Sequence, residues 1–153
     1  MEEIFESKTK QNTPYFSFHG YECYARVVDV YDGDTLTAVF EFKGEFYKFK
    51  IRLSNIDTCE IKSKQVEIKN KALEAKKRLL DLIRKGDNGI ELNDKVFLVY
   101  LKCGKFDKYG RLLCDVLSME KDINFGEILL NEHLAYQYDG GKKLSEQEQL
   151  NDV

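Results

Sequence analysis

The sequence has few of the residues from which several familiar sites are built. It has two histidines, one proline and four cysteines in 153 residues, and no two cysteines form a C-x-x-C pair. No histidine lies at ligand spacing from a cysteine, so a zinc site is not expected. A Ser-His-Asp set, a phosphate-binding P-loop and a glycine-rich dinucleotide motif are also missing. Carboxylates and arginines are therefore the remaining candidates for a functional site.

Long apolar runs are missing as well. No stretch approaches the length of a membrane span, so we expect no membrane partner. The first twenty residues are mixed and polar, without the basic start and apolar core of a secretory signal. We therefore expect free thiols and an intracellular, cytoplasmic location. Secretion of a trimmed chain stays open as the alternative.

Positive charge is slightly in deficit. The net charge is -3 and the pI about 5.5, which argues against a protein that coats nucleic acid through bulk positive charge. A local basic site remains compatible with this composition. Arginine is scarce, and two of the five, Arg52 and Arg111, stand at the ends of predicted strands.

Apolar periodicity predicts one domain of mixed structure. Residues 1–14 have no clear period and carry the only proline, so we interpret them as a flexible arm before a single domain at 15–153. An amphipathic helix of about five turns is predicted between Ser63, as N-cap, and Gly86. Short helices are predicted at 124–131 and after Ser145. The predicted strands are 15–31 with a bend at 19–20, 35–42, 45–56, 95–103 and 111–117, with an extended piece at 134–138.

This order of elements favours a five-stranded OB-fold β-barrel with about three helices, an α+β fold. A five-stranded α+β sandwich fits the same count, and propensity alone does not separate the two.

The stretch from Tyr31 to Glu60 carries the strongest chemical signal. A predicted hairpin brings its two ends together, which places Asp34 near Asp57, with Arg52 and Glu60 close by. Two carboxylates and a backbone carbonyl make an open site for a hard cation, and arginine binds phosphate through two nitrogens. Each residue also has a structural interpretation. The aspartates suit turns, and Arg52 could pair with Glu60 or Asp57.

Two further groups carry the same ambiguity. Glu60 could lie on the surface, or it could orient or deprotonate a water beside a metal. Arg111 follows Lys105, Lys108 and Tyr109, which could form a solvated basic turn or add a second phosphate-binding arm and a stacking ring.

Taken together, four ordered motifs resemble the staphylococcal nuclease (thermonuclease) family. They are Asp32-Gly33-Asp34-Thr35, Ile51-Arg52-Leu53, Ile56-Asp57-Thr58-Cys59-Glu60 and Lys108-Tyr109-Gly110-Arg111, and the resemblance runs from about Tyr24 to Gly141. It implies an OB-fold barrel that cuts DNA and/or RNA phosphodiesters with Ca²⁺. We also expect a monomer.

The resemblance assigns roles to particular residues. It implies that Asp34 and Asp57 bind Ca²⁺ through carboxylates and Thr58 through its backbone carbonyl. It also implies that Glu60 acts as general base or orients the water, and that Arg52 and Arg111 bind the scissile phosphate.

Three more residues are implied to contact the substrate. Lys108 and Tyr109 would touch the terminal phosphate of the nucleotide, and Tyr138 matches a tyrosine of the nucleotide site.

The chain departs from the family pattern in ways that bear on activity. Cys59 stands where the family has proline, the stretch from Glu60 to the helix is short, the last helix is short, and the chain is acidic. None of these departures removes a catalytic group. A catalytically silent nuclease-like module that binds nucleic acid or protein is the alternative to an enzyme, but such modules usually lose the metal carboxylates or the arginines, which this chain retains. An oligonucleotide binder without chemistry is a third possibility, but it would have no use for Asp34, Asp57 and Glu60.

Overall fold

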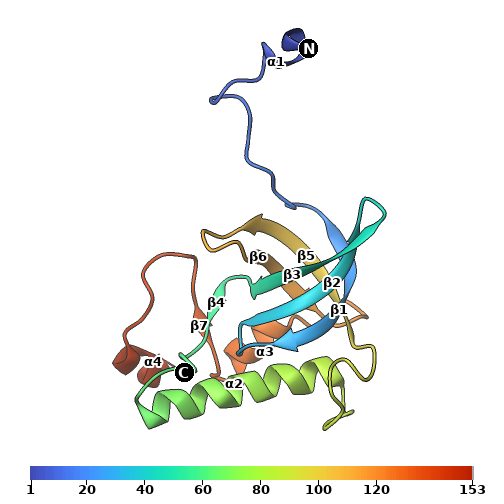
Figure 1. The fold of residues 1–153 in the computed structure, drawn as a ribbon. Helices are drawn as coiled ribbons and strands as arrows, with labels where there is room; N and C mark the ends of the chain where they lie inside the picture. Colours follow the sequence, from blue (N-terminus) through green and yellow to red (C-terminus); the bar gives the residue numbers. More distant parts are fainter. Residues whose placement is uncertain (153) are drawn as a thin grey trace.

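Five strands close into a barrel in the computed structural model, which describes residues 1–152 (Figure 1). The order around the barrel is β1-β2-β3-β6-β5, and only the β3–β6 pair is parallel. The predicted α+β barrel is confirmed, and the alternative sandwich is wrong. The strands are β1 (Glu22–Val30), β2 (Thr35–Phe42), β3 (Glu45–Leu53), β5 (Leu98–Phe106) and β6 (Leu112–Leu117).

The alternation of side chains along each strand divides the barrel into a core and an outer face. In β3, Ile51 and Leu53 lie in the core, whereas Arg52 between them points to the other side of the sheet. The side chains that fill the barrel are aliphatic and aromatic, and the largest fully buried ones include Phe40, Leu36 and Leu101. Because Ile51 and Leu53 point into the core, Arg52 must lie on the opposite, outer face of β3.

Helix α2 (Val66–Arg84) lies across one end of the barrel (Figure 1). It buries Ile68, Ala72, Ala75, Leu79 and Ile83, at the helical spacing expected from the sequence. The turn between β1 and β2 packs closely on this helix, because a Cβ on Gly33 would lie 2.6 Å from the Cβ of Ala75. Glycine is thus required at position 33 for close approach, and the helix holds the turn that carries Asp34.

The predicted strand at 45–56 is wrong in its last part. β3 ends at Leu53, and Asn55 has a φ of 67°, a left-handed conformation that asparagine tolerates better than most residues. The chain then forms β4 (Ile56–Asp57), which pairs with β7 (Tyr136–Gln137) in a separate two-stranded sheet. This small sheet brings the C-terminal part of the chain to Asp57.

Other predicted boundaries also shift. The first strand begins at Glu22, after a turn at His19–Gly20, and contains a register shift between Val27 and Asp29. β5 runs on to Phe106, because a register shift after Cys103 lets the strand pass Gly104. Helix α2 begins at Val66 with Gln65 as its N-cap, so Ser63 is not the cap. Ser63 instead donates a hydrogen bond to Glu146.

The remaining helices are short. They are α1 (Glu2–Phe5), α3 (Phe125–Asn131) and α4 (Glu146–Asp152). α1 was not expected from the sequence, and it lies in an exposed N-terminal segment, residues 1–17, that extends away from the barrel (Figure 1). Ser145 and Glu148 cap α4 reciprocally, as predicted. Within residues 1–152, no helix has the length and apolar character needed to cross a membrane.

All four cysteines are free thiols, as predicted. Cys103 lies directly opposite Cys114 across β5 and β6. A hydrogen bond to Cys114, with burial, raises the pKa of the Cys103 thiol to about 12. Thiols with raised pKa values are weak nucleophiles, so this group packs the barrel rather than reacts.

Candidate functional site

Two aspartates from different parts of the chain converge on Arg52. Arg52 Nη1 lies 2.9 Å from Asp34 Oδ2, and Nη2 donates to Asp57 Oδ1 at 3.0 Å. All three side chains are buried, with no more than 6% of any of them exposed. The hairpin β2–β3 places Asp34 and Arg52, since Thr35 pairs with Arg52, and β4 places Asp57.

Thr58 ties the two carboxylates together. Its backbone N–H donates to Asp34 Oδ2 and to Asp57 Oδ1, each at 3.1 Å. Asp34 Oδ1 accepts from the hydroxyl of Thr35 at 2.9 Å. One oxygen of each carboxylate thus faces the same point in space, which is the arrangement that the sequence predicts for the hairpin ends.

A cavity of about 390 Å³ opens beside this cluster. Its lining includes Asp34, Arg52, Asp57, Thr58, Glu60 and Arg111. Glu60 is 58% exposed there, and Cys59 beside it is buried against Ile68 and Ala72 of α2. The residue that stands where the family has proline therefore anchors the segment that carries Glu60.

A second cavity, of about 400 Å³, shares Arg52 and Arg111 with the first. Lys108, Tyr109 and Tyr138 line this second cavity. The guanidinium of Arg52 lies 5.9 Å from the ring centre of Tyr138, and that of Arg111 lies 5.3 Å from the ring centre of Tyr109. The structure thus brings all nine predicted site residues to two adjoining cavities joined by the arginines.

The two arginines differ in how they are held. Arg111 Nε donates to Asp107 Oδ2 at 2.7 Å, and its side chain is 27% exposed. Arg52 is buried, and its two terminal nitrogens are engaged by Asp34 and Asp57. A phosphate at Arg52 would therefore share the guanidinium with these two carboxylates, whereas Arg111 is the more accessible cation.

Sequence reasoning missed two residues that contact the cluster. The hydroxyl of Tyr136 donates to Asp57 Oδ2 at 2.6 Å, and the ammonium of Lys143 lies 3.5 Å from both Asp57 Oδ2 and Glu60 Oε1. Tyr136 could have been found as the inward partner of the aromatic segment at 134–138. Lys143 lies in a polar stretch after two glycines, and nothing in that stretch of sequence predicts its contact with Asp57 and Glu60.

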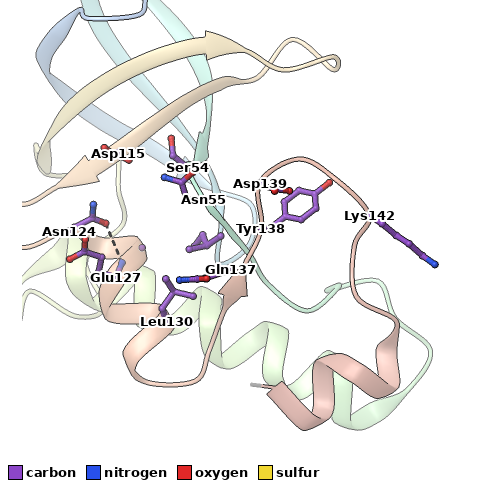
Figure 2. A pocket seen from close by; sticks show the side chains of 12 residues that line it. Ser54, Asn55, Asp115, Asn124, Glu127, Leu130, Gln137, Tyr138, Asp139 and Lys142 are labelled. Atoms are coloured by element: carbon purple, nitrogen blue, oxygen red, sulfur yellow. Dashed lines mark hydrogen bonds between the residues drawn. The ribbon is translucent and has the colours of Figure 1, made fainter.

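A third hollow, of about 550 Å³, lies beyond Tyr138 (Figure 2). Figure 2 shows Asn124 and Glu127 at the start of α3, Gln137 and Tyr138 on the β7 segment, and Lys142 pointing away from the others. Its lining includes Asp115, Glu127 and Asp139, which would repel phosphate. The charges thus favour an anion at the arginines over one in this hollow.

Burial raises the pKa values of both aspartates above their ordinary range. For Asp34 the charge of Asp32 adds to this effect, and Arg52 opposes it. For Asp57 the hydrogen bond from Tyr136 opposes it, and Asp34 adds to it. Folding therefore penalises the negative charge of both carboxylates.

We expect the Asp34→Asn variant to be more stable than the parent protein at neutral pH. A carboxyl whose pKa is raised on folding adds stability below its unfolded pKa, and this contribution is lost as the pH rises through the folded pKa. The free energy of unfolding of the variant, relative to that of the parent, should therefore increase as the pH rises from acidic to neutral. Urea titrations across that range, in chelator, measure this difference.

Asp107→Asn is the matched control for that experiment. Burial acts to raise the pKa of Asp107, but hydrogen bonds from Arg111 and Tyr109 outweigh it, and the net pKa is lowered. The variant should therefore lose stability relative to the parent as the pH rises. If both variants lose stability relative to the parent as the pH rises, Asp34 is not a group whose charge is penalised by folding.

Tyr136→Phe should lower the free energy of unfolding by about 1–3 kcal/mol, because the buried Asp57 carboxylate loses a donor. Tyr100→Phe is the control, since its hydroxyl binds the exposed Glu22, and we expect a change within about 0.5 kcal/mol. The midpoint of urea unfolding at pH 7 separates these outcomes. An equal effect for both variants would mean that the Tyr136–Asp57 bond contributes little.

The donor chemistry at the aspartates fits Ca²⁺. Carboxylate oxygens are ligands that a hard cation prefers, and no histidine or cysteine lines the cavity. Each oxygen of Asp34 and Asp57 now contacts a donor or a cation of the protein, so an ion would have to replace some of these contacts. Within residues 1–152, no group of three or more His, Cys, Asp or Glu side chains is arranged to hold a metal. An ion here would rest on Asp34, Asp57, the Thr58 carbonyl and water.

Comparison with known proteins adds the family. The family model described as staphylococcal nuclease homologue matches residues 50–153, which is more than half of the chain. Among curated proteins, no match was found. The matched part contains Arg52, Asp57, Glu60 and Arg111, and the closed barrel agrees with the resemblance of the motifs. The chain therefore belongs to the family of staphylococcal nuclease homologues.

Proposed function

We propose that the protein is a Ca²⁺-dependent nuclease that hydrolyses phosphodiester bonds of DNA and/or RNA, and that it acts as a monomer. The observation that carries the proposal is the pair of adjoining cavities that share Arg52 and Arg111. One is lined by Asp34, Asp57 and Glu60 among its carboxylates, and the other by Lys108, Tyr109 and Tyr138. A phosphodiester bound at the arginines would place its phosphorus next to the carboxylates of the first cavity and a nucleoside next to the tyrosines of the second.

The arginines would bind the phosphate and its transition state. A phosphodiester repels an attacking water or hydroxide, and two guanidinium groups offset that charge more strongly as it builds up. The position of both arginines supports this role, because each lines both cavities. Arg111 would share its guanidinium between Asp107 and the phosphate.

Glu60 would orient the attacking water and accept its proton. It suits this role because it is exposed on the cavity and lies near Lys143, which can hold its carboxylate in place. A Ca²⁺ held by Asp34, Asp57 and the Thr58 carbonyl would supply positive charge for the phosphate oxygens. Lys108 and Tyr109 would bind a terminal phosphate, and Tyr138 would pack on the nucleoside.

Degradation of plasmid DNA and of RNA in Ca²⁺, in Mg²⁺ and in excess chelator tests the proposal. We expect cleavage in Ca²⁺ and its loss in chelator. Full activity in chelator would refute the metal dependence. Binding of nucleic acid without cleavage in any metal would refute the enzyme and identify a silent module.

A further inference from the structure

We propose that the outer face of β3 binds the backbone of a single-stranded polynucleotide next to the scissile phosphate. This proposal rests on the proposed nuclease function and extends it from the reacting phosphate to the chain beside it. The surface consists of Lys50, Lys48 and Phe46, and we call it the β3 strip.

The strip begins at the arginines. Side chains two apart along a strand share a face, so Lys48 and Lys50 lie on the same face as Arg52, opposite the core residue Ile51. β3 pairs in parallel with β6 from Ile51 and Leu112 onward. One step back along both strands stand Lys50 and Arg111, and both line the cavity that contains the carboxylates. Lys50 therefore continues the cationic row beyond the proposed phosphate site.

The spacing of the strip suits an extended phosphodiester chain. Neighbouring side chains on one face of a strand are about 6.7 Å apart, so Lys50 and Lys48 could each reach a successive phosphate of an extended single strand. Their cross-strand partners on β2 are the uncharged Thr37 and Val39. Glu41, opposite Phe46, is the first acidic partner, and it ends the run of positive charge.

Both lysines are available to a ligand. They are exposed, and neither makes a side-chain hydrogen bond or ion pair within residues 1–152. Phe46 is 69% exposed at the end of the strip. A base that is not paired can stack on such a ring, which a base within a duplex cannot do. The combination of one row of cations and one ring fits a single strand.

The charge of the site gives such a strip a role in holding the substrate. The cavity is lined by five carboxylates and four cationic side chains, and the whole chain carries a net charge of -3. A polyanion would be repelled by most of this surface. Lysines beside the site can hold the strand without occupying the groups proposed for the chemistry.

The test compares two double variants with the same loss of charge. Lys48→Gln/Lys50→Gln changes the strip, and Lys69→Gln/Lys77→Gln changes two exposed lysines of α2. Binding of a fluorescent single-stranded oligonucleotide is measured in chelator over a series of salt concentrations. The strip variant should bind about tenfold more weakly at low salt, with a salt dependence shallower by about 1.4, because each phosphate neutralised on a single strand contributes about 0.7.

Three further arms sharpen the result. Phe46→Ala should weaken binding about fivefold or more without changing the salt dependence, because it removes stacking and no charge. Binding of a duplex of the same sequence should be weakened less than binding of the single strand in every strip variant. Hydrolysis of a nitrophenyl phosphodiester of a single nucleoside should be unchanged in Lys48→Gln, because Lys48 lies outside the cavity that contains the carboxylates and this substrate is too short to reach it.

The outcomes separate this proposal from the proposed function. Unchanged oligonucleotide binding in the strip variant, equal losses in the α2 control, or an equal effect on duplex would overturn the strip, whether or not the protein cleaves. If the parent protein cleaves neither substrate but loses oligonucleotide binding only in the strip variants, the strip stands and the nuclease proposal fails.

Discussion

Replacing Arg52 or Arg111 by lysine is expected to lower kcat for phosphodiester cleavage by about 10²- to 10³-fold. Lysine keeps the positive charge but loses the planar fork with which arginine binds two oxygens. If both groups bind the transition state more tightly than the substrate, kcat should fall by a larger factor than KM rises.

The structure predicts that the two variants will differ in stability. Arg52 is 4% exposed and bridges Asp34 and Asp57 through separate nitrogens, and a single ammonium does not span both carboxylates. We therefore expect Arg52→Lys to lower the free energy of unfolding by on the order of 2 kcal/mol, because a buried carboxylate loses its donor.

Arg111→Lys should leave stability within about 1 kcal/mol of the parent. Its pair with Asp107 is partly exposed, and the Asp107 carboxylate keeps the backbone N–H groups of Tyr109 and Arg111 as donors. Arg111 is therefore the sharper test of catalysis, because a lower rate would not be accompanied by unfolding.

Steady-state rates and melting temperature, measured on the same preparations, decide between the roles. Lys85→Gln is the control, since its exposed ion pair with Glu120 lies away from both cavities. A near-normal kcat with a depressed melting temperature in both arginine variants would show that these residues hold the scaffold and that another group binds the phosphate.

Most of the barrel could be predicted because its signals are local. The alternation in β2 and the helical spacing from Ile68 to Ile83 depend on nearby residues. The end of β3 could not be predicted from apolar pattern, because Ile56 continues that pattern after the break at Asn55. Ile56 belongs to β4, and its partner Gln137 in β7 lies about eighty residues further along the chain.

The candidate site shows the same division. The hairpin alone predicted that Asp34 and Asp57 would meet. The basic turn suggested Arg111 and Lys108 as a second phosphate-binding arm, and the family resemblance favoured that interpretation over a solvated turn. The hydroxyl of Tyr136 and the ammonium of Lys143 reach Asp57 through the C-terminal segment, whose path depends on the β4–β7 pair. These contacts depend on the tertiary path of the chain, so the apolar periodicity of the sequence does not predict them.

The Asp34→Asn and Glu60→Gln variants are expected to fail for different reasons. Asparagine removes one of the two carboxylates proposed for Ca²⁺, and the affinity of such sites depends strongly on ligand charge, so binding should weaken at least about tenfold. Glu60 is assigned to the water, so Glu60→Gln should bind Ca²⁺ nearly as the parent does and lose about 10²- to 10⁴-fold in kcat.

Calorimetric titration with Ca²⁺ and initial rates at saturating Ca²⁺ measure the two effects separately. For Asp34→Asn, weaker Ca²⁺ binding should accompany the higher stability expected at neutral pH, because the same buried negative charge opposes folding and attracts the cation. A variant that binds Ca²⁺ more weakly and also unfolds more easily would show a damaged fold instead. If Glu60→Gln loses Ca²⁺ as severely as Asp34→Asn, Glu60 belongs to the metal ligands, and the base must be sought elsewhere along the cavity.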